Sequence, residues 1–103
     1  MNDLAERKFM GMLEASGAPK KASYNRAEFC RIFGISERTF YRMVAAHDLD
    51  PETGEPLFPW TVDSYMTRGH HRVRYAECVD YLARNRTIER KLAADPRQMS
   101  IFD

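Results

Sequence analysis

The sequence is poor in cysteine, has no long apolar run and carries almost no net charge. Two cysteines in 103 residues are too few for the disulfide framework of a small secreted domain. No apolar run approaches the roughly 20 residues that a membrane-spanning helix needs. The N-terminal residues also lack the apolar core and cleavage pattern of a secretory signal. We therefore expect a cytoplasmic protein of bacterial or phage type.

Residue sets that carry catalysis are also missing from the sequence. We find no nucleophile with a supporting base and acid, no phosphate-cradling glycine loop and no cysteine pair. His47, His70 and His71 lack the spacing of a metal site. We therefore expect neither an enzyme nor a bound metal or cofactor. Cys30 and Cys78 fall at apolar positions of expected helices, which favours two buried thiols.

The chain does have enough apolar residues for one core, and its charges are segregated. Its length suits a single domain, and 44% hydrophobic residues with a mean hydropathy of -0.58 fit a soluble protein. The net charge of +1 does not by itself indicate a nucleic-acid partner, but segregated charge can still present a positive face to phosphates. The acidic stretch contains Asp48, Asp50, Glu52 and Glu55; the first basic stretch contains Arg68, His70, His71, Arg72 and Arg74; the second contains Arg84, Arg86, Arg90 and Lys91.

Periodicity and capping residues predict three helices in the first half of the chain. Residues 3–16 have the apolar spacing of an amphipathic helix that packs on the domain or serves as an arm. Asn25 is a good N-cap for a second helix, and Glu28 lies where it completes a capping box. Gly34 is expected to end that helix with a positive φ. Ser36 then caps a third helix that ends near residue 46.

The second half is expected to hold an exposed loop, two short strands and a fourth helix. Three prolines and one glycine between residues 47 and 59 indicate the loop. We expect the strands at residues 60–62 and 73–75. The fourth helix is expected over residues 76–85, with residues 86–94 as its candidate extension.

The spacing around Gly34 predicts a helix-turn-helix. A small residue, Cys30, lies where the two helices must approach closely, and the flanking apolar residues can hold the helices at a steep angle. These apolar residues are Phe29, Phe33, Ile35, Phe40 and Met43. The alternative is an ordinary helical hairpin in a small α domain.

Several side chains on the second helix of this unit suit contact with DNA. The N-terminal part of such a helix meets base edges in the major groove. Arg38 and Arg42 carry the planar fork that grips guanine O6 and N7, whereas nearby hydroxyls can bond phosphates. The alternative is that these arginines form a solvated face. The candidate DNA-contacting residues are Ser36, Glu37, Arg38, Thr39, Tyr41 and Arg42.

Residues 24–45, followed by residues 68–82, resemble the excisionase and MerR-type winged helix-turn-helix domains. The match includes a capped helix, the turn Gly34-Ile35-Ser36, a recognition helix, and Gly69-His70-His71-Arg72 where the wing tip would lie. In this family an arginine often stands where this chain has His71. The resemblance implies that the wing contacts the minor groove or flanking phosphates, and the matching candidates are Arg68, His70, His71, Arg72 and Arg74. The alternative for the histidines is that they are exposed polar turn residues.

The chain departs from the family in two ways. The segment at residues 47–65 is longer than the family norm, which affects how the wing is placed. The chain also lacks the long coiled coil and effector domain of full MerR regulators. We therefore do not expect a small-molecule sensor.

The C-terminal peptide suggests a second kind of partner. Gln98, Met99, Ser100, Ile101 and Phe102 resemble the short motif by which bacterial proteins bind the DNA sliding clamp. A chain end after Pro96 suits a peptide that extends into a pocket. The alternative is a tail that folds back onto the core.

Taken together, these patterns predict a mainly α-helical, winged helix-turn-helix protein with a small two-stranded wing and an extra N-terminal helix. We divide it into residues 1–22 (helix and linker), 23–94 (DNA-binding domain) and 95–103 (tail). The expected ligand is double-stranded DNA, bound in the nucleoid by an excisionase-like architectural factor or a small transcriptional regulator. A sliding clamp or a recombinase is a further expected partner. We also expect cooperative self-association on DNA. The alternative function is a replication-linked adaptor that uses residues 98–102.

Overall fold

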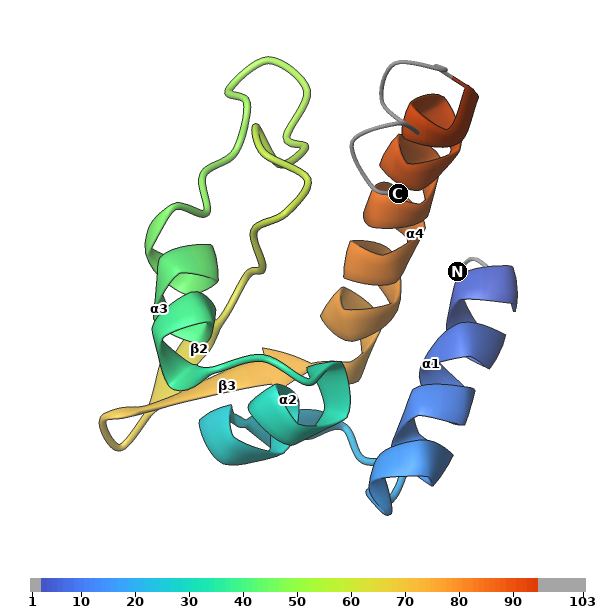
Figure 1. Ribbon diagram of the computed structural model, residues 1–103. Coiled ribbons are helices and arrows are strands. Elements are labelled where there is room, and N and C mark those ends of the chain that lie inside the picture. The colour runs from blue at the N-terminus through green and yellow to red at the C-terminus, as the bar shows by residue number, and fades with distance from the viewer. Residues whose placement is uncertain (1–2, 95–103) are drawn as a thin grey trace.

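The described part of the chain consists of four helices and a three-stranded antiparallel sheet (Figure 1). The computed structural model describes residues 3–94, and the side chains of residues 3–85. The elements in chain order are α1 (Asp3–Ser16), β1 (Ser23–Asn25), α2 (Arg26–Phe33), α3 (Glu37–Ala45), β2 (Tyr65–Thr67), β3 (His70–Arg74) and α4 (Tyr75–Ala94). The chain is therefore mixed α and β, with one more strand than the two-stranded wing expected from the sequence.

The turn between α2 and α3 follows from local capping chemistry, as the sequence predicted. The Asn25 side chain accepts a hydrogen bond from the Glu28 backbone N–H at 2.8 Å, and the Glu28 carboxylate accepts one from the Asn25 N–H at 3.0 Å. Gly34 ends α2 with a φ of 66°, which glycine adopts without a steric cost. The Ser36 hydroxyl then accepts from the Thr39 N–H and caps α3. The expected capping box, glycine stop and serine cap are confirmed.

Substitution of Glu28 by glutamine is expected to make stability less sensitive to acid. Burial acts to raise the pKa of Glu28, but the ion pair with Lys21 and the Asn25 N–H outweigh it and hold this pKa below its ordinary value of 4.5. Because the folded-state pKa is lowered, the stabilisation exists above the unfolded-state pKa and is lost as pH falls through the folded-state pKa. Urea unfolding should show Glu28→Gln about 0.2–1 kcal/mol less stable at neutral pH. This difference should shrink below pH 4.5, and a difference that stays constant with pH would contradict the assignment.

The sheet has the order β1-β3-β2, so β3 lies in the centre. Tyr24 of β1 pairs with Val73, and Met66 of β2 pairs with His71. The sequence had assigned no strand to residues 23–25, because three residues become a strand here only through pairing with β3, far along the chain. β1 also links α1 to the rest of the fold.

The strand expected at residues 60–62 is wrong, since β2 begins five residues later, at Tyr65. Thr61 and Val62 are instead fully buried without being in the sheet, and the Val62 N–H donates to the Met43 carbonyl at the end of α3. Their burial explains the apolar pattern that suggested a strand. The second expected strand is β3, which begins earlier than predicted, and Tyr75 already starts α4.

The N-terminal helix is part of the hydrophobic core. Ala5, Phe9 and Leu13 of α1 are buried, and α1 packs against α4 and α2 (Figure 1). The Phe9 ring meets those of Tyr24 and Tyr75 edge-on, with centroids 5.8 and 5.3 Å apart. Of the two packing modes left open by the sequence, α1 therefore adopts the docked one. None of the helices within residues 3–94 is long and apolar enough to cross a membrane.

The two cysteines differ in their surroundings. Cys78 of α4 is fully buried, and this burial raises the pKa of its thiol to about 12, so it behaves as a small apolar side chain. Cys30 of α2 is only half-buried, although burial also raises the pKa of its thiol. The expectation of a buried thiol is confirmed in full for Cys78 and in part for Cys30.

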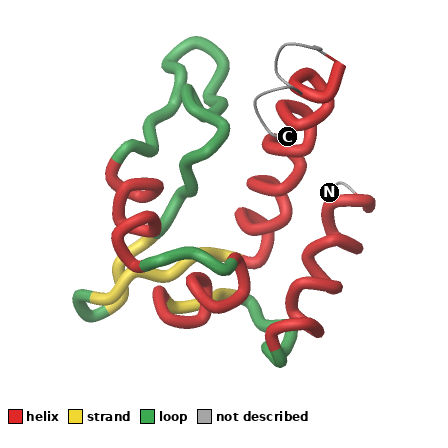
Figure 2. Tube along the Cα trace, in the orientation of Figure 1, coloured by secondary structure: helices red, strands yellow, loops and turns green. Residues whose placement is uncertain are grey.

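Residues 47–60 form an irregular loop, here named the acidic loop, that extends beyond the C-terminal end of α3 (Figure 2). An isolated β-bridge joins Leu49 to Pro56, and Gly54 turns the chain with a φ of 74°. The Asn85 amide of α4 donates to the Pro59 carbonyl at 2.9 Å. The expected exposed loop is confirmed, and its end is attached to α4.

Candidate nucleic-acid interface

One face of α3 is exposed, and the opposite face is buried. Phe40 and Met43 point into the core. This partition follows from the apolar spacing of the helix. The exposed residues include Ser36, Glu37, Arg38, Thr39, Tyr41 and Arg42. Four of them, Glu37, Arg38, Tyr41 and Arg42, are the outward positions expected from the sequence. Two arginines and a tyrosine are therefore available on one surface next to the capped N-terminus of α3.

The turn between β2 and β3 presents an arginine at its tip. Arg68 and Gly69 have φ values of 53° and 81°, so both central residues of the turn have positive φ, as in the tight turns that suit β-hairpins. Thr67 and His70 pair across the base of the turn. A positive φ is uncommon for a residue other than glycine. The hairpin thus holds the exposed Arg68 side chain at the end of the sheet.

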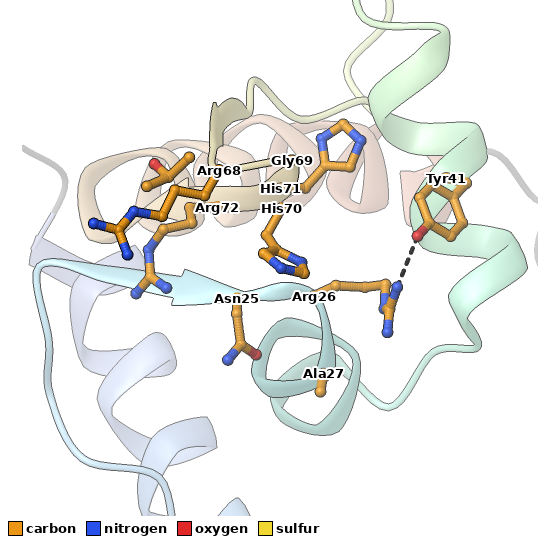
Figure 3. Close-up of a pocket in the computed structure, with 10 residues that line it drawn as sticks. Asn25, Arg26, Ala27, Tyr41, Arg68, Gly69, His70, His71 and Arg72 are labelled. Atoms are coloured by element: carbon orange, nitrogen blue, oxygen red, sulfur yellow. Dashed lines mark hydrogen bonds between the residues drawn. The ribbon is translucent and has the colours of Figure 1, made fainter.

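An open groove of about 460 Å³ separates this hairpin from α2 and α3 (Figure 3). Figure 3 shows Arg68 and Arg72 on one side of it and Arg26 with Tyr41 on the other. Its lining residues are Asn25, Arg26, Ala27, Tyr41, Thr67, Arg68, Gly69, His70, His71 and Arg72. Since this lining contains three arginines and no acidic residue, the groove suits an anionic ligand.

Arg26 is a groove residue that the sequence analysis missed. Its guanidinium donates to the Tyr41 hydroxyl at 2.8 Å and lies 3.2 Å from the Glu37 carboxylate, so the first residue of α2 is tied to the exposed face of α3. The hydrogen bond to Tyr41, followed by the charge of Glu37, raises the pKa of Arg26. Its position after the N-cap was visible in the sequence, but its contacts depend on how α2 and α3 cross.

His71 joins the hairpin to α3 rather than pointing outward. Its ring meets the rings of Phe40 and Tyr41 edge-on, at centroid distances of 6.0 and 5.8 Å. Its Nδ1 lies 3.1 Å from the Ser64 hydroxyl oxygen. His71 is half-buried, whereas the neighbouring His70 is exposed. His71 therefore positions the hairpin, and His70 is the histidine available to a ligand.

The two arginines of β3 have partners within the protein. Arg72 donates to the hydroxyl and the carbonyl oxygen of Ser23, at 2.8 and 3.2 Å, and so ties β3 to β1. The Arg74 guanidinium lies 4.4 Å from the centre of the Tyr65 ring. Arg72 thus has a structural role in addition to lining the groove, which the sequence pattern did not reveal.

Arg84 is the one residue of the second basic stretch whose side chain the structure describes. Arg84 is half-buried, and it donates to the Glu77 carboxylate at 3.0 Å and to the Thr61 carbonyl at 2.9 Å. It therefore supports the chain after the acidic loop. The side chains of residues 86–94, and all of residues 98–102 with their clamp-like motif, lie outside what the structure describes.

The residues that line the groove offer guanidinium, imidazole, amide and hydroxyl groups for ion pairing and hydrogen bonding. Among the described residues, no group of three or more His, Cys, Asp and Glu side chains is placed to hold a metal ion. Comparisons of the chain with protein-family models, with curated proteins and with solved structures found no match. The geometry of the groove and of α3 is thus the basis for a functional conclusion.

Proposed function

We propose that this chain is a sequence-specific duplex DNA-binding protein of the winged helix-turn-helix type. In this proposal α3 enters the major groove, and the β2–β3 hairpin is the wing that contacts the adjacent backbone or minor groove. The observation that carries the proposal is that the exposed face of α3 and the hairpin turn border the same arginine-lined groove. A small protein with near-zero net charge thereby concentrates positive charge on one surface.

The groove would take the DNA backbone, and α3 would read the bases. Arg26, Arg68 and Tyr41 line the groove, and in this proposal they would contact phosphate oxygens and fix the position of the protein without reading sequence. Arg38 and Arg42 lie before and after Tyr41 on the exposed face of α3, and in this proposal they would reach guanine edges. In this arrangement, backbone contacts set the affinity and salt dependence, and α3 sets the sequence preference.

The small size of the unit bears on its biological role. A single module of this kind buries limited surface on DNA, so one copy alone is expected to bind weakly. Cooperative binding of several copies at repeated sites, as in an excisionase-like architectural factor or a small regulator, would compensate for the weak binding of one copy. The alternative of a sliding-clamp adaptor rests on the sequence of residues 98–102 alone.

Replacement of Arg68 by asparagine is expected to weaken the binding of duplexes of different sequence, and to weaken each of them by about the same factor. Asparagine tolerates the positive φ of this turn, so the hairpin should be retained. Loss of one phosphate contact should reduce the slope of log affinity against log salt by about one. Fluorescence anisotropy over a salt series measures this slope.

Arg7→Asn is the matched control, because Arg7 is an exposed arginine on α1, outside the groove. It should leave the slope almost unchanged. An Arg68 variant with the parental slope, or a loss confined to one DNA sequence, would show that the hairpin does not contact phosphate.

A further inference from the structure

The acidic loop carries half of the large apolar side chains that are exposed in residues 3–85. Of the eight large hydrophobic side chains that are exposed in residues 3–85, four lie in this loop: Leu49, Leu57, Phe58 and Trp60. Each is 45–49% exposed, and the rings of Phe58 and Trp60 have centroids 6.1 Å apart. Such a cluster on a small soluble domain is typical of a contact surface.

The negative charge of the loop disfavours DNA as its ligand. Residues 47–60 contain four acidic residues and no lysine or arginine, although the whole chain has a net charge of +1. The rest of the chain is therefore positively charged. A loop that carries four carboxylates as well as exposed aromatic rings would repel phosphates, and it matches a cationic surface that offers apolar or aromatic contacts.

The loop has a defined shape before it meets a ligand. The Asp50 N–H donates to the Glu55 carbonyl at 2.8 Å, and the Leu57 N–H donates to the Asp48 carbonyl at 2.9 Å. The buried Thr61 hydroxyl donates to the Phe58 carbonyl at 2.8 Å. Because the backbone is already held, docking through this loop would cost little additional ordering.

We propose that the acidic loop of one copy docks into the arginine-lined groove of a second copy. The groove offers Arg26, Arg68 and Arg72 for the carboxylates of the loop, and the exposed ring of Tyr41 for its aromatic side chains. Both the charge and the apolar character of the two surfaces are therefore complementary. The chain itself provides the cationic partner that the loop requires.

The contact must form between copies rather than within one. The loop and the hairpin turn lie at opposite ends of the molecule (Figures 1 and 2). Hydrogen bonds from Asn85 to Pro59 and from Arg84 to Thr61 attach the end of the loop and the residue that follows it to α4. Since the loop and the groove are different surfaces, the contact is head-to-tail and leaves a free loop and a free groove for further copies. A groove occupied in this way would be closed to DNA, so self-docking and DNA binding would compete.

Sedimentation velocity of the full chain, without DNA, tests this inference at increasing protein concentration and at low and high salt. We expect reversible self-association that salt weakens. The double variant Phe58→Ser/Trp60→Ser should raise the apparent dissociation constant roughly tenfold or more, since it removes the central apolar contacts. Leu4→Ser, which changes an exposed apolar residue on α1, should associate like the parent.

A charge exchange identifies the two surfaces directly. The variants Glu52→Lys/Glu55→Lys and Arg68→Asp should each fail to self-associate, and an equimolar mixture of the two should associate again. A chain that stays monomeric at every concentration would overturn the inference and leave the loop to a different protein. Association that survives all the loop and groove substitutions would overturn it as well, in favour of another interface.

Self-docking and DNA binding can be tested independently of each other. Glu52 and Glu55 lie outside the DNA-contacting set, so Glu52→Lys/Glu55→Lys should bind duplex DNA at least as tightly as the parent. If this variant loses self-association and retains DNA binding, the result supports both the docking contact and the proposed function. Self-association that depends on the loop and on Arg68, in a chain that binds no DNA, would retain the docking contact and reject the proposed function.

Discussion

Replacement of Phe29 by alanine is expected to lower the free energy of unfolding by about 3–5 kcal/mol. Phe29 is fully buried on α2, and its ring stacks on that of Phe33 at 4.3 Å and meets that of Phe40 on α3 at 5.4 Å. The substitution therefore leaves a cavity at the contact that holds the two helices together. A domain of this size has a total stability of about 5–15 kcal/mol, so a large part of it would be lost.

Phe58→Ala is the matched control, because Phe58 is an exposed phenylalanine of the acidic loop. Its effect should stay within about 0.5 kcal/mol. Urea unfolding followed by circular dichroism compares the two variants. Similar losses for both, or a small loss for Phe29→Ala, would show that the α2–α3 contact is not central to the core.

Replacement of Arg42 by alanine is expected to cost about 1–3 kcal/mol at the preferred DNA site and much less at unrelated sequences. Arg42 is exposed on the face of α3 assigned to base readout, opposite the buried Phe40 and Met43. A site is first selected from a duplex pool with the parent protein. Competition titrations with selected and unrelated duplexes then give the specificity ratio.

Arg42→Lys separates base readout from charge. Lysine keeps the positive charge but lacks the planar fork of arginine, so it should preserve binding to unrelated DNA and lose most of the preference for the selected site. An Arg42→Ala variant that weakens all duplexes equally would place Arg42 on the backbone. Variants that bind like the parent would remove α3 from the interface.

The elements that the sequence predicted well are those set by neighbouring residues. Asn25, Glu28, Gly34 and Ser36 act within a few residues of themselves, so the caps and the glycine turn could be placed before the structure was known. The exposed face of α3 followed from helical periodicity for the same reason. Local patterns are sufficient for features of this kind.

The features that the sequence did not predict depend on contacts between distant segments. β1 exists because residues 23–25 pair with β3, and Arg72 is held by Ser23 across that pairing. The contact of Arg26 with Tyr41 requires the packing of α2 against α3. No spacing within one segment indicates such partners, which is why the strand at residues 60–62 was also misplaced.

The most direct test of the proposed function is the binding of the full chain to duplex DNA at two salt concentrations. A labelled pool of genomic duplexes is titrated with protein, and binding is followed by fluorescence anisotropy. The arginine-lined groove predicts binding at low salt that weakens steeply as salt is raised. Absence of binding at low salt would contradict DNA recognition by α3 and the hairpin, and would leave residues 98–102 and a protein partner as the remaining hypothesis.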